Sequence, residues 1–426
     1  MRKCFLFLIL FFQFLPAAHA YIDPATGSML LSLVISVFAT IFFLFNGLII
    51  KIKTFFKADK GLSFNTFPYV IYSEGKQYFN VFKPIVDEFE KRQIELVYYT
   101  SSKDDPIFSY EYKFIKPEFI GQGMKAYSKL AFLKADICLM TTPHLDVLHL
   151  KRSKFTKHYI HIFHAVASSM NYRLFSLDYY DSVLCDGEFQ IPLIRELERK
   201  RNLPPKDLEV VGCTYMDVLA DKIKTLPPKN SDFTILVAPS WGESGILRKY
   251  GEVFIDNLIN SKYKIIIRPH PQTLISEKDV VDKLISKYKG AENLSWNFDV
   301  ENLNVLSFAD VLISDFSGVM FDYAFLFNKP FLYLNKEVNR EIYDISDIEG
   351  EIWRDKAIKD IGVELLPSDM DNIIQIIENL SQDDEIQNRI SNAKDVAWQH
   401  RGESGIRAVE FMIRKYEELK NVGKSL

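Results

Sequence analysis

From Phe67 onward, short apolar runs alternate along the chain with helix-length amphipathic segments. The runs are rich in Val, Ile and Tyr and lack polar alternation, which is typical of strands that are buried on both faces of a parallel sheet. In the first series the predicted strands are Pro68–Tyr72, Ile94–Thr100, Asp136–Met140, Tyr159–His164, Ser182–Cys185 and Glu209–Gly212. Helices are predicted between them at Gln77–Lys91, Met124–Leu133 and Ile191–Asn202.

The polar segment 221–232, which contains two adjacent prolines, predicts a linker, and the same pattern then begins again. The second series predicts strands at Thr234–Ala238, Lys264–Arg268, Val311–Ser314 and Pro330–Leu334. Its predicted helices are Val253–Asn260, Lys278–Lys287, Gly318–Phe327, Met370–Leu380 and Ile406–Leu419. Two βα series of similar size predict an α/β protein with two facing, doubly wound, Rossmann-type domains. Their expected bounds are 61–220 and 233–426, and the second includes closing helices.

Two apolar stretches precede this body. Residues 1–20 have a basic start, an apolar run and an Ala-His-Ala end, which is the layout of a secretory signal peptide or, if uncleaved, a signal-like anchor. Residues 21–60 are predicted to form an external tip, a transmembrane helix and a basic juxtamembrane segment. The helix is Met29–Ile50, whose 22 uncharged residues are enough to cross a bilayer. The lysines after it predict that the body lies on the cytoplasmic side of the membrane.

The charge balance argues against a nucleic-acid partner. The 426 residues contain 52 Lys plus Arg and 56 Asp plus Glu, which gives a net charge of −4. Residues 1–57 hold five of the basic residues and one acid, so the body alone carries −8. Binding to a phosphate backbone needs clustered cations. The four cysteines show no zinc spacing, and three of them lie in apolar runs, which predicts buried thiols.

Ligands of doubly wound sheets bind beyond the carboxyl ends of the strands, so polar residues directly after the apolar runs are the candidates for a site. His164 ends one predicted strand, and its near-neutral pKa range suits a general base for a hydroxyl. The competing interpretation is a core or capping histidine. His161, three residues earlier, is expected to point to the opposite face, which argues against a joint metal site.

A second candidate is Arg268-Pro269-His270-Pro271, which follows a run of isoleucines. The prolines fix the backbone where the strand ends. A rigidly held Arg268 and His270 at a sheet edge suit a phosphate ester, through charge-assisted hydrogen bonds. The alternative is that the prolines merely end the strand and that Arg268 pairs with a carboxylate.

The third candidate is the segment from Ser314 to Asp322, Ser-Asp-Phe-Ser-Gly-Val-Met-Phe-Asp, in which a strand leads into a helix. Ser314, Asp315 and Ser317 are all competent N-caps, and Gly318 permits close backbone approach. The free N–H groups of the helix's first turn are expected to hold a phosphate. Ordinary helix capping is the competing interpretation. The segment is not a Walker loop.

A weaker candidate follows the strand that opens the second series. Its Gly/Ser turn runs through Ser240 and Glu243, and both are possible substrate contacts because such a turn presents backbone N–H groups. Gly and Ser are common turn residues, so the turn alone is not specific. No convincing metal ligand set, and no need for a cofactor, is evident in the sequence.

In their order along the chain, these segments resemble the CDP-glycerol glycerophosphotransferase family, the teichoic-acid glycerol-phosphate primases and polymerases. The resemblance covers roughly residues 158–337. Family members carry W-H-G-T, G-x-P-R-x-D, A-P-T-W, a histidine after the next strand, and S-D-Y-S-S-x-x-F-D. The counterparts here are Phe163-His164-Ala165-Val166, Gly212 to Asp217, Ala238-Pro239-Ser240-Trp241, Arg268-Pro269-His270 and Ser314 to Asp322.

The resemblance implies a GT-B arrangement in which the second domain binds a CDP-linked polyol donor without an obligatory metal. It assigns His270, Ser317 and the following helix turn to the donor pyrophosphate, and places Asp322 near the nucleotide or in support of that loop. His164 is implied to be the base on an acceptor hydroxyl. Asp217, the end of the second motif, is a possible substrate contact. The acceptor implied is a lipid-linked glycan or a polyol phosphate at the membrane.

Two other interpretations remain open. The same fold also serves sugar-nucleotide glycosyltransferases and, less readily, epimerases, because fold alone does not fix chemistry. A membrane-bound scaffold that has lost activity is a third possibility. The residues His164, His270, Asp315 and Ser317 argue against the scaffold.

Overall fold

The computed structural model describes residues 66–166, 172–229, 232–243, 245–299, 301–315, 317–334, 340–380 and 384–422. The predicted signal segment 1–20 and transmembrane helix 29–50 lie outside the described residues. Among the residues that are described, no helix combines the length and apolarity that crossing a membrane requires. The described part of the chain is an α/β body with two all-parallel sheets, as the apolar runs predicted.

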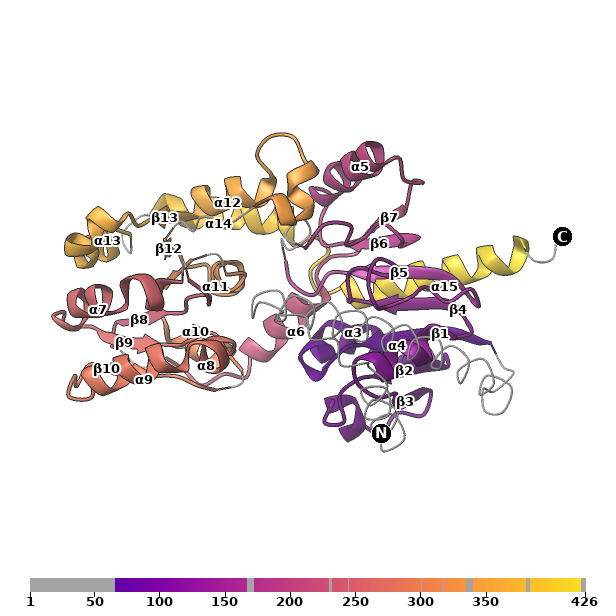
Figure 1. The fold of residues 1–426 in the computed structure, drawn as a ribbon, viewed down its shortest axis with the longest axis horizontal. Coiled ribbons are helices and arrows are strands. Elements are labelled where there is room, and N and C mark those ends of the chain that lie inside the picture. The colour runs from indigo at the N-terminus through magenta and orange to yellow at the C-terminus, as the bar shows by residue number, and fades with distance from the viewer. Residues whose placement is uncertain are drawn as a thin grey trace, which may run out of the picture. The chain divides into compact units, whose positions relative to one another are not determined.

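The first sheet has seven strands in the order β3-β2-β1-β4-β5-β6-β7. Its central strands are buried along almost their whole length, because helices cover both faces (Figure 1). The bounds are β1 (Phe67–Ser73), β2 (Leu96–Thr100), β3 (Ile115–Phe119), β4 (Ala135–Met140), β5 (Thr156–Ile162), β6 (Ser182–Cys185) and β7 (Asp207–Val210). The order reverses between β1 and β4, which marks a topological switch point.

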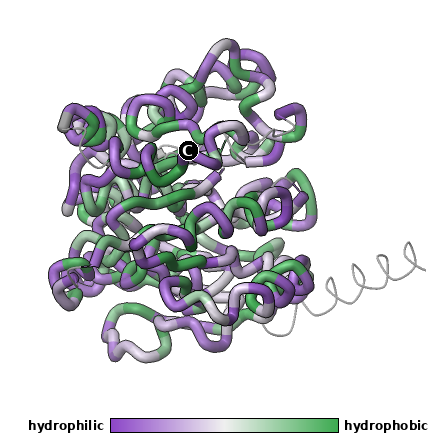
Figure 2. The backbone as a smooth tube through the Cα atoms, turned by 90° about the vertical axis from the view of Figure 1, so that its left-hand side faces the viewer, coloured by the Kyte–Doolittle hydropathy of each residue, from purple (hydrophilic) through white to green (hydrophobic). Residues whose placement is uncertain are grey.

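The helices of this sheet are amphipathic, and the first three follow the predicted segments, whereas the fourth was not predicted and ends inside the expected linker 221–232. They are α3 (Phe79–Lys91), α4 (Met124–Leu130), α5 (Gln190–Arg201) and α6 (Thr214–Ile223), with short 3₁₀ turns η1 (Lys76–Tyr78) and η2 (Pro106–Ser109). Figure 2 shows hydrophobic and hydrophilic positions interspersed along the described chain. Cys138, Cys185 and Cys213 are buried free thiols, as predicted.

The second sheet has six strands in the order β10-β9-β8-β11-β12-β13, which is the order of a dinucleotide-binding fold. Its strands are β8 (Thr234–Val237), β9 (Lys264–Ile267), β10 (Leu294–Trp296), β11 (Val311–Ser314), β12 (Phe331–Tyr333) and β13 (Gly362–Glu364). Its helices are α7 (Ile246–Ile259), α8 (Thr273–Ser276), α9 (Lys278–Lys287), α10 (Leu303–Phe308), α11 (Val319–Phe327), α12 (Trp353–Ile361), α13 (Ile373–Leu380) and α14 (Asp384–Ala397). The strand order reverses between β8 and β11.

Two segments of the second half leave their own sheet and join the core of the first. The last helix, α15 (Ser404–Val422), packs against α3 and β4, and its Val409 and Phe411 belong to the same buried cluster as Tyr69 and Phe82. The segment after β12 contains the 3₁₀ turns η4 (Arg340–Ile342) and η5 (Asp344–Asp347), and it places Ile345 in the other core of that sheet. A further 3₁₀ turn, η6 (Pro367–Asn372), follows β13.

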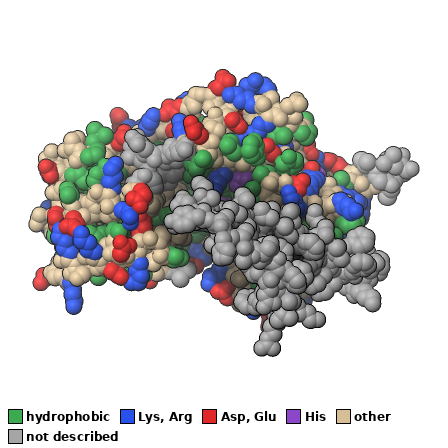
Figure 3. All heavy atoms as spheres, in the orientation of Figure 1, with side chains coloured by type: hydrophobic (Ala, Val, Ile, Leu, Met, Phe, Trp, Pro, Cys, Tyr) green, Lys and Arg blue, Asp and Glu red, His purple; other side chains and the backbone are tan. Residues whose placement is uncertain are grey.

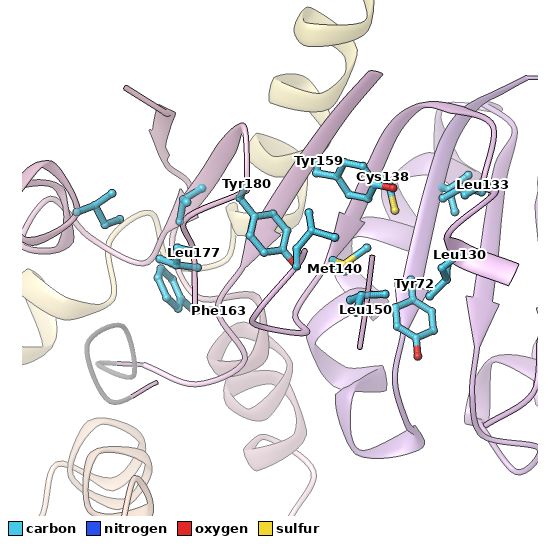
Figure 4. Packing of buried hydrophobic residues seen from close by; sticks show 14 of the residues in the cluster. Tyr72, Leu130, Leu133, Cys138, Met140, Leu150, Tyr159, Phe163, Leu177 and Tyr180 are labelled. Carbon is cyan, nitrogen blue, oxygen red and sulfur yellow. The ribbon is translucent and has the colours of Figure 1, made fainter. Parts of the chain in front are cut away.

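The core that receives Ile345 is aromatic and aliphatic. Figure 4 shows Tyr72, Cys138, Met140 and Tyr159, from three neighbouring strands, packed side by side in it. Burial of such side chains supplies the main favourable free energy of folding, at roughly 25 cal/mol per Å² of apolar surface. The presence of Ile345 in this core therefore holds the segment after β12 against the first sheet.

Candidate active site

The predicted motifs of the second half converge at the switch point of its sheet. The loops that follow β8, β9 and β11 carry Ser240, His270 and Asp315, and β8 lies between β9 and β11 in the sheet. Ser314, the last residue of β11, is fully buried, and its hydroxyl donates to the carbonyl of Ala238 at 2.7 Å. Ser314 thus joins two loops and does not face a ligand.

Asp315 is the centre of this arrangement. It is buried, and its Oδ1 accepts a hydrogen bond from the backbone N–H of Ser240 at 2.7 Å. Its Oδ2 has no hydrogen-bond partner among the described residues. Because an unsatisfied buried carboxylate oxygen is costly, this atom is a ready acceptor for a bound hydroxyl or a protonated imidazole.

The imidazole of His270 interacts electrostatically with Asp315. Its Nδ1 accepts a hydrogen bond from the backbone N–H of Gln272 at 3.1 Å, so the neutral ring carries its proton on Nε2. Burial lowers the pKa of His270 below its ordinary value, and the negative charge of Asp315 opposes that shift. In either protonation state, Nε2–H is a donor of the kind that a phosphate oxygen accepts.

Arg268 does not join His270. Its guanidinium donates to the side-chain oxygen of Asn297 and, at 2.8 Å, to the carbonyl of Asp299. Both partners lie after β10, on the side of β9 away from β8. Arg268 therefore holds the loop after β10, and the expected Arg268/His270 pair on one phosphate stays a prediction.

The start of α11 is capped locally. The Ser317 hydroxyl accepts from the backbone N–H of Val319 at 3.4 Å, and the backbone of Gly318 has an ordinary φ of −62°. A Cβ on Gly318 would meet nothing within 4 Å, so no close approach requires a glycine there. Ser317 and Gly318 lie beside Asp315 in sequence, at the open end of the sheet.

Asp322 lies in the region where α11 contacts α6. It is 7% exposed on the first turns of α11, which contacts α6, and its charge is the main cause of a raised pKa at Tyr215 of α6. Burial raises the pKa of Asp322 itself to about 7. Its Oδ1 has no hydrogen-bond partner within the described part of the chain. Of the two predicted roles, this location fits support of the loop.

The turn after β8 is held by a buried carboxylate. Gly242 has φ +98°, and its backbone N–H donates to Oε2 of Glu277 at 2.9 Å. Glu243 is exposed and pairs with Arg248 at 3.0 Å. Gly242, Glu243 and Glu277 shape the turn. The remaining candidate for a ligand contact is the Ser240 segment, next to Asp315.

Asp217 is not directed at a substrate. Its carboxylate accepts hydrogen bonds from the indole N–H of Trp398 at 2.9 Å, the backbone N–H of Gly402 at 2.9 Å and that of Ser404 at 3.2 Å. The Ser404 hydroxyl donates to it as well. The predicted substrate contact is therefore a tie between α6 and the start of α15.

His164 lies at the carboxyl edge of the first sheet, two residues beyond the observed end of β5. Its Nδ1 is 2.9 Å from the hydroxyl oxygen of Tyr172, and the ring of Tyr78 contacts it edge-on at 5.4 Å. Burial lowers the pKa of His164 to about 4, so the ring is neutral at pH 7. Val166, two residues further, belongs to the same hydrophobic cluster as Phe321 of α11.

His161, three residues before His164, differs from it in its hydrogen bonding. It is fully buried, and neither ring nitrogen has a partner among the described residues. The rings of Phe163, Tyr172 and Tyr180 surround it at 5.0 to 5.7 Å. The ring of Tyr172 contacts both histidines, at 5.7 Å from His161 and 5.8 Å from His164.

Three polar residues of the site were not found from the sequence. Glu74 follows β1 at the switch point of the first sheet, where it accepts from the hydroxyls of Tyr127 at 2.9 Å and Thr142 at 3.3 Å. The rule applied to the other strands, polar residues directly after an apolar run, would have found Glu74. Tyr172 and Glu277 follow no apolar run, and no local signal marks them.

Charged side chains of both signs are mixed on the surface. Figure 3 shows Lys and Arg side chains interspersed with Asp and Glu over the described part of one face. Within the described residues, no group of three or more His, Cys, Asp and Glu side chains is arranged to hold a metal ion.

Residues 214–347 match the family model of the CDP-glycerol:poly(glycerophosphate) glycerophosphotransferases. The match spans α6 to η5 and includes Ser240, His270, Asp315 and Asp322, whereas His164 lies before it. The resemblance predicted from the motifs is confirmed, and with it the prediction of a glycerophosphotransferase-like enzyme. The search of curated proteins gave no match.

Solved structures confirm the fold. The wall teichoic acid polymerase TagF superposes with a TM-score of 0.51 at 16% identity, over 83% of this chain and 90% of that one. The UDP-GlcNAc 2-epimerase of Methanocaldococcus jannaschii, in complex with UDP-GlcNAc and UDP, gives 0.54 at 17% identity, over 81% and 99%. The epimerase of Neisseria meningitidis gives 0.52 at 14%, over 81% and 100%. At these identities the likeness shows a shared GT-B-like α/β fold.

Proposed function

We propose that this chain, whose residues 214–347 carry the pattern of the CDP-glycerol:poly(glycerophosphate) glycerophosphotransferases, transfers a polyol phosphate from a CDP-linked donor to an acceptor hydroxyl. The observation that carries the proposal is the convergence of Ser240, His270 and Asp315 at the switch point of the second sheet. Switch points are where doubly wound sheets bind nucleotides.

The donor side offers a fixed hydrogen-bond donor to a phosphate. That donor is Nε2–H of His270, and Asp315 holds the neighbouring turn after β8 through the N–H of Ser240. In phosphoryl transfer the protein contributes mainly positioning and charge stabilisation, which fixed N–H groups supply at little reorganisation cost. His270 then stabilises the oxygen that leaves with CMP.

His164 is the proposed base. The acceptor hydroxyl oxygen attacks the β-phosphorus, its proton moves to Nε2 of His164, and the bond from that phosphorus to the bridging oxygen breaks. CMP leaves with the electron pair of that bond, and the polyol phosphate becomes a phosphodiester. The neutral state of His164 at pH 7, which follows from its lowered pKa, is the state that a base requires.

The acceptor is proposed to be a lipid-linked or envelope glycan hydroxyl at the inner face of a bacterial cytoplasmic membrane. The uncharged stretch 29–50 and the lysines after it support this placement, as the anchor would keep His164 near a lipid-linked substrate. Fusion of a cytoplasmic reporter to the C-terminus, with and without residues 29–50, tests it. Loss of membrane association only in the deletion is expected, and association in both would contradict the anchor.

Thermal-shift titration of the full chain tests the donor. We expect stabilisation by CMP, CDP-glycerol or CDP-ribitol and none by UDP or UDP-sugars. His270→Ala should lose the stabilisation, whereas His164→Ala should keep it and lose turnover by a factor of about 10² to 10⁴. His149→Ala, an exposed histidine, is the matched control.

Each outcome separates one interpretation from the others. Stabilisation by a UDP-sugar alone would replace the proposal with a sugar-nucleotide glycosyltransferase or epimerase. Binding of CDP-glycerol with no release of CMP in the presence of membrane acceptors, in the wild type as in His164→Ala, would favour the inactive scaffold.

A further inference from the structure

The hydroxyl oxygen of Tyr172 forms a hydrogen bond with Nδ1 of His164, and the two atoms are 2.9 Å apart. Tyr172 follows no motif, and nothing in the sequence marks it as part of a site. A hydrogen bond at one ring nitrogen decides which tautomer a neutral imidazole adopts, and therefore which nitrogen can accept a proton. The hydrogen-bond partner of Nδ1 therefore determines whether Nε2 can accept a proton.

We propose that Tyr172 is a positioning residue for His164: its oxygen accepts Nδ1–H, which keeps Nε2 unprotonated and aimed at the acceptor hydroxyl. This inference rests on the proposed function, because a base at this place needs a free Nε2. The opposite direction, in which the Tyr172 hydroxyl donates to Nδ1, leaves the proton on Nε2 and makes the ring a donor instead. The two directions predict different, observable tautomers.

The backbone of Tyr172 is held by the segment after β12, which comes from the second half of the chain. The N–H of Asp344 donates to the carbonyl of Tyr172 at 2.9 Å, and the N–H of Leu174 donates to the carbonyl of Ile342 at 3.1 Å. Between them Arg173 and Tyr343 form an antiparallel bridge. Tyr172 is thus one end of a short strand-like pairing between the two halves.

The side chain of Asp344 closes this pairing. It is completely buried, and Oδ1 accepts from the N–H of Phe175 at 2.8 Å, while the Ser176 hydroxyl donates to Oδ2. Arg201, at the end of α5, donates to Oδ1 at 2.8 Å and also pairs with Asp178 at 2.7 Å. A buried carboxylate with an ion-pair partner and backbone donors is a rigid element.

The hydrogen bonds and ion pair of Asp344 thus connect two halves of the chain. The segment after β12 belongs to the half with the donor site, and His164 belongs to the first half. When Asp344 and its neighbours pair with 172–176, Tyr172 is fixed and His164 takes the tautomer that the reaction needs. We therefore infer that the orientation of His164 depends on the docking of this segment.

The tautomer can be observed directly. Long-range ¹H–¹⁵N correlation spectra of the full chain, with ¹⁵N in the imidazole rings, distinguish protonated Nδ1 from protonated Nε2, and His164→Gln assigns the signal among the eight histidines. We expect the Nδ1–H tautomer in the wild type and a mixture in Tyr172→Phe. Tyr288→Phe, which removes a hydroxyl directly after α9 that is bonded to Asp256 of α7, should leave the spectrum unchanged. An Nε2–H tautomer in the wild type would overturn the proposal.

Kinetics give a second, independent test. Tyr172→Phe removes one neutral hydrogen bond, so kcat should fall about tenfold while KM for the CDP-linked donor stays within about twofold. Asp344→Asn should lower kcat in the same direction and shift the tautomer toward a mixture. Equal kcat in Tyr172→Phe and the wild type refutes the positioning role. Absence of turnover with any CDP-linked donor would refute the proposed function, and the spectra would still decide the tautomer.

Discussion

Replacing Asp322 by asparagine is expected to make the protein increasingly more stable than the wild type as the pH rises. Asp322 is buried between α11 and α6, and its Oδ1 lacks a hydrogen-bond partner among the described residues. Burial raises its pKa from 3.8 to about 7, because a carboxylate in this environment loses its hydration. The folded protein therefore holds a proton there that the unfolded chain releases.

The sign and size of the effect follow from linkage. The folded-state pKa lies above the unfolded one, so the stability from this group is fully present below pH 3.8 and is lost as the pH rises to about 7. The loss amounts to about 4 kcal/mol in total, at about 1.4 kcal/mol per pH unit. Asparagine has the same shape and no proton to release, so Asp322→Asn lacks this loss.

Urea unfolding of both proteins at intervals between pH 4 and pH 8 measures the prediction. The free energy of unfolding of Asp322→Asn minus that of the wild type should rise by about 4 kcal/mol and level off above pH 7. Equal m-values in the two proteins serve as the control, because they show that the same surface unfolds. A difference that stays constant with pH would mean that Asp322 is ionised in the folded protein and that its environment is wrongly described.

Three further results are expected from groups described above. His161→Phe should make the protein less sensitive to acid, because burial lowers the pKa of His161 from 6.5 to about 3. The stabilising contribution of neutral His161 is complete above pH 6.5 and falls by about 2 kcal/mol by pH 5. Urea unfolding at the two pH values measures this, and equal acid sensitivity of the two proteins would contradict it. Asp217→Ala should cost about 3 kcal/mol in thermal unfolding, because it strands the N–H groups of Trp398, Gly402 and Ser404, and a cost below about 1 kcal/mol would argue against the tie. Arg268→Met should change donor affinity less than about threefold by calorimetry, since Arg268 is bound by the loop after β10, and a loss of tenfold or more would return it to the phosphate site.

The architecture was readable from the sequence because both sheets are parallel and buried, so most strands appear as uninterrupted apolar runs. The strands that were missed are the exceptions to this rule. In β3, Ile115–Phe119, buried and exposed residues alternate and Pro117 interrupts the run, as befits an edge strand. The strands β10 and β13 have three residues each and are too short to show a period.

The site was readable to the extent that its residues follow strands. His270 and Asp315 were found because each stands at a strand end within a recognisable motif, and the structure brings them together. Asp217 was misjudged because its partner Trp398 lies 181 residues away and is joined to it only by folding. The contact of Arg268 with Asn297, 29 residues away, could not be read from the sequence for the same reason. Tyr172 and Asp344 escaped notice for the same reason.

The return of α15 to the first sheet has a consequence for synthesis on the ribosome. Val409 and Phe411 complete the core that begins with Tyr69, so this domain lacks part of its interior until α15 has emerged. The second sheet, from β8 to β13, has every strand available more than forty residues earlier. Although domains usually fold in the order in which they are made, here the first to be translated is the last to be finished. A nascent chain stalled before Ser404 should therefore show protease protection in the second sheet first.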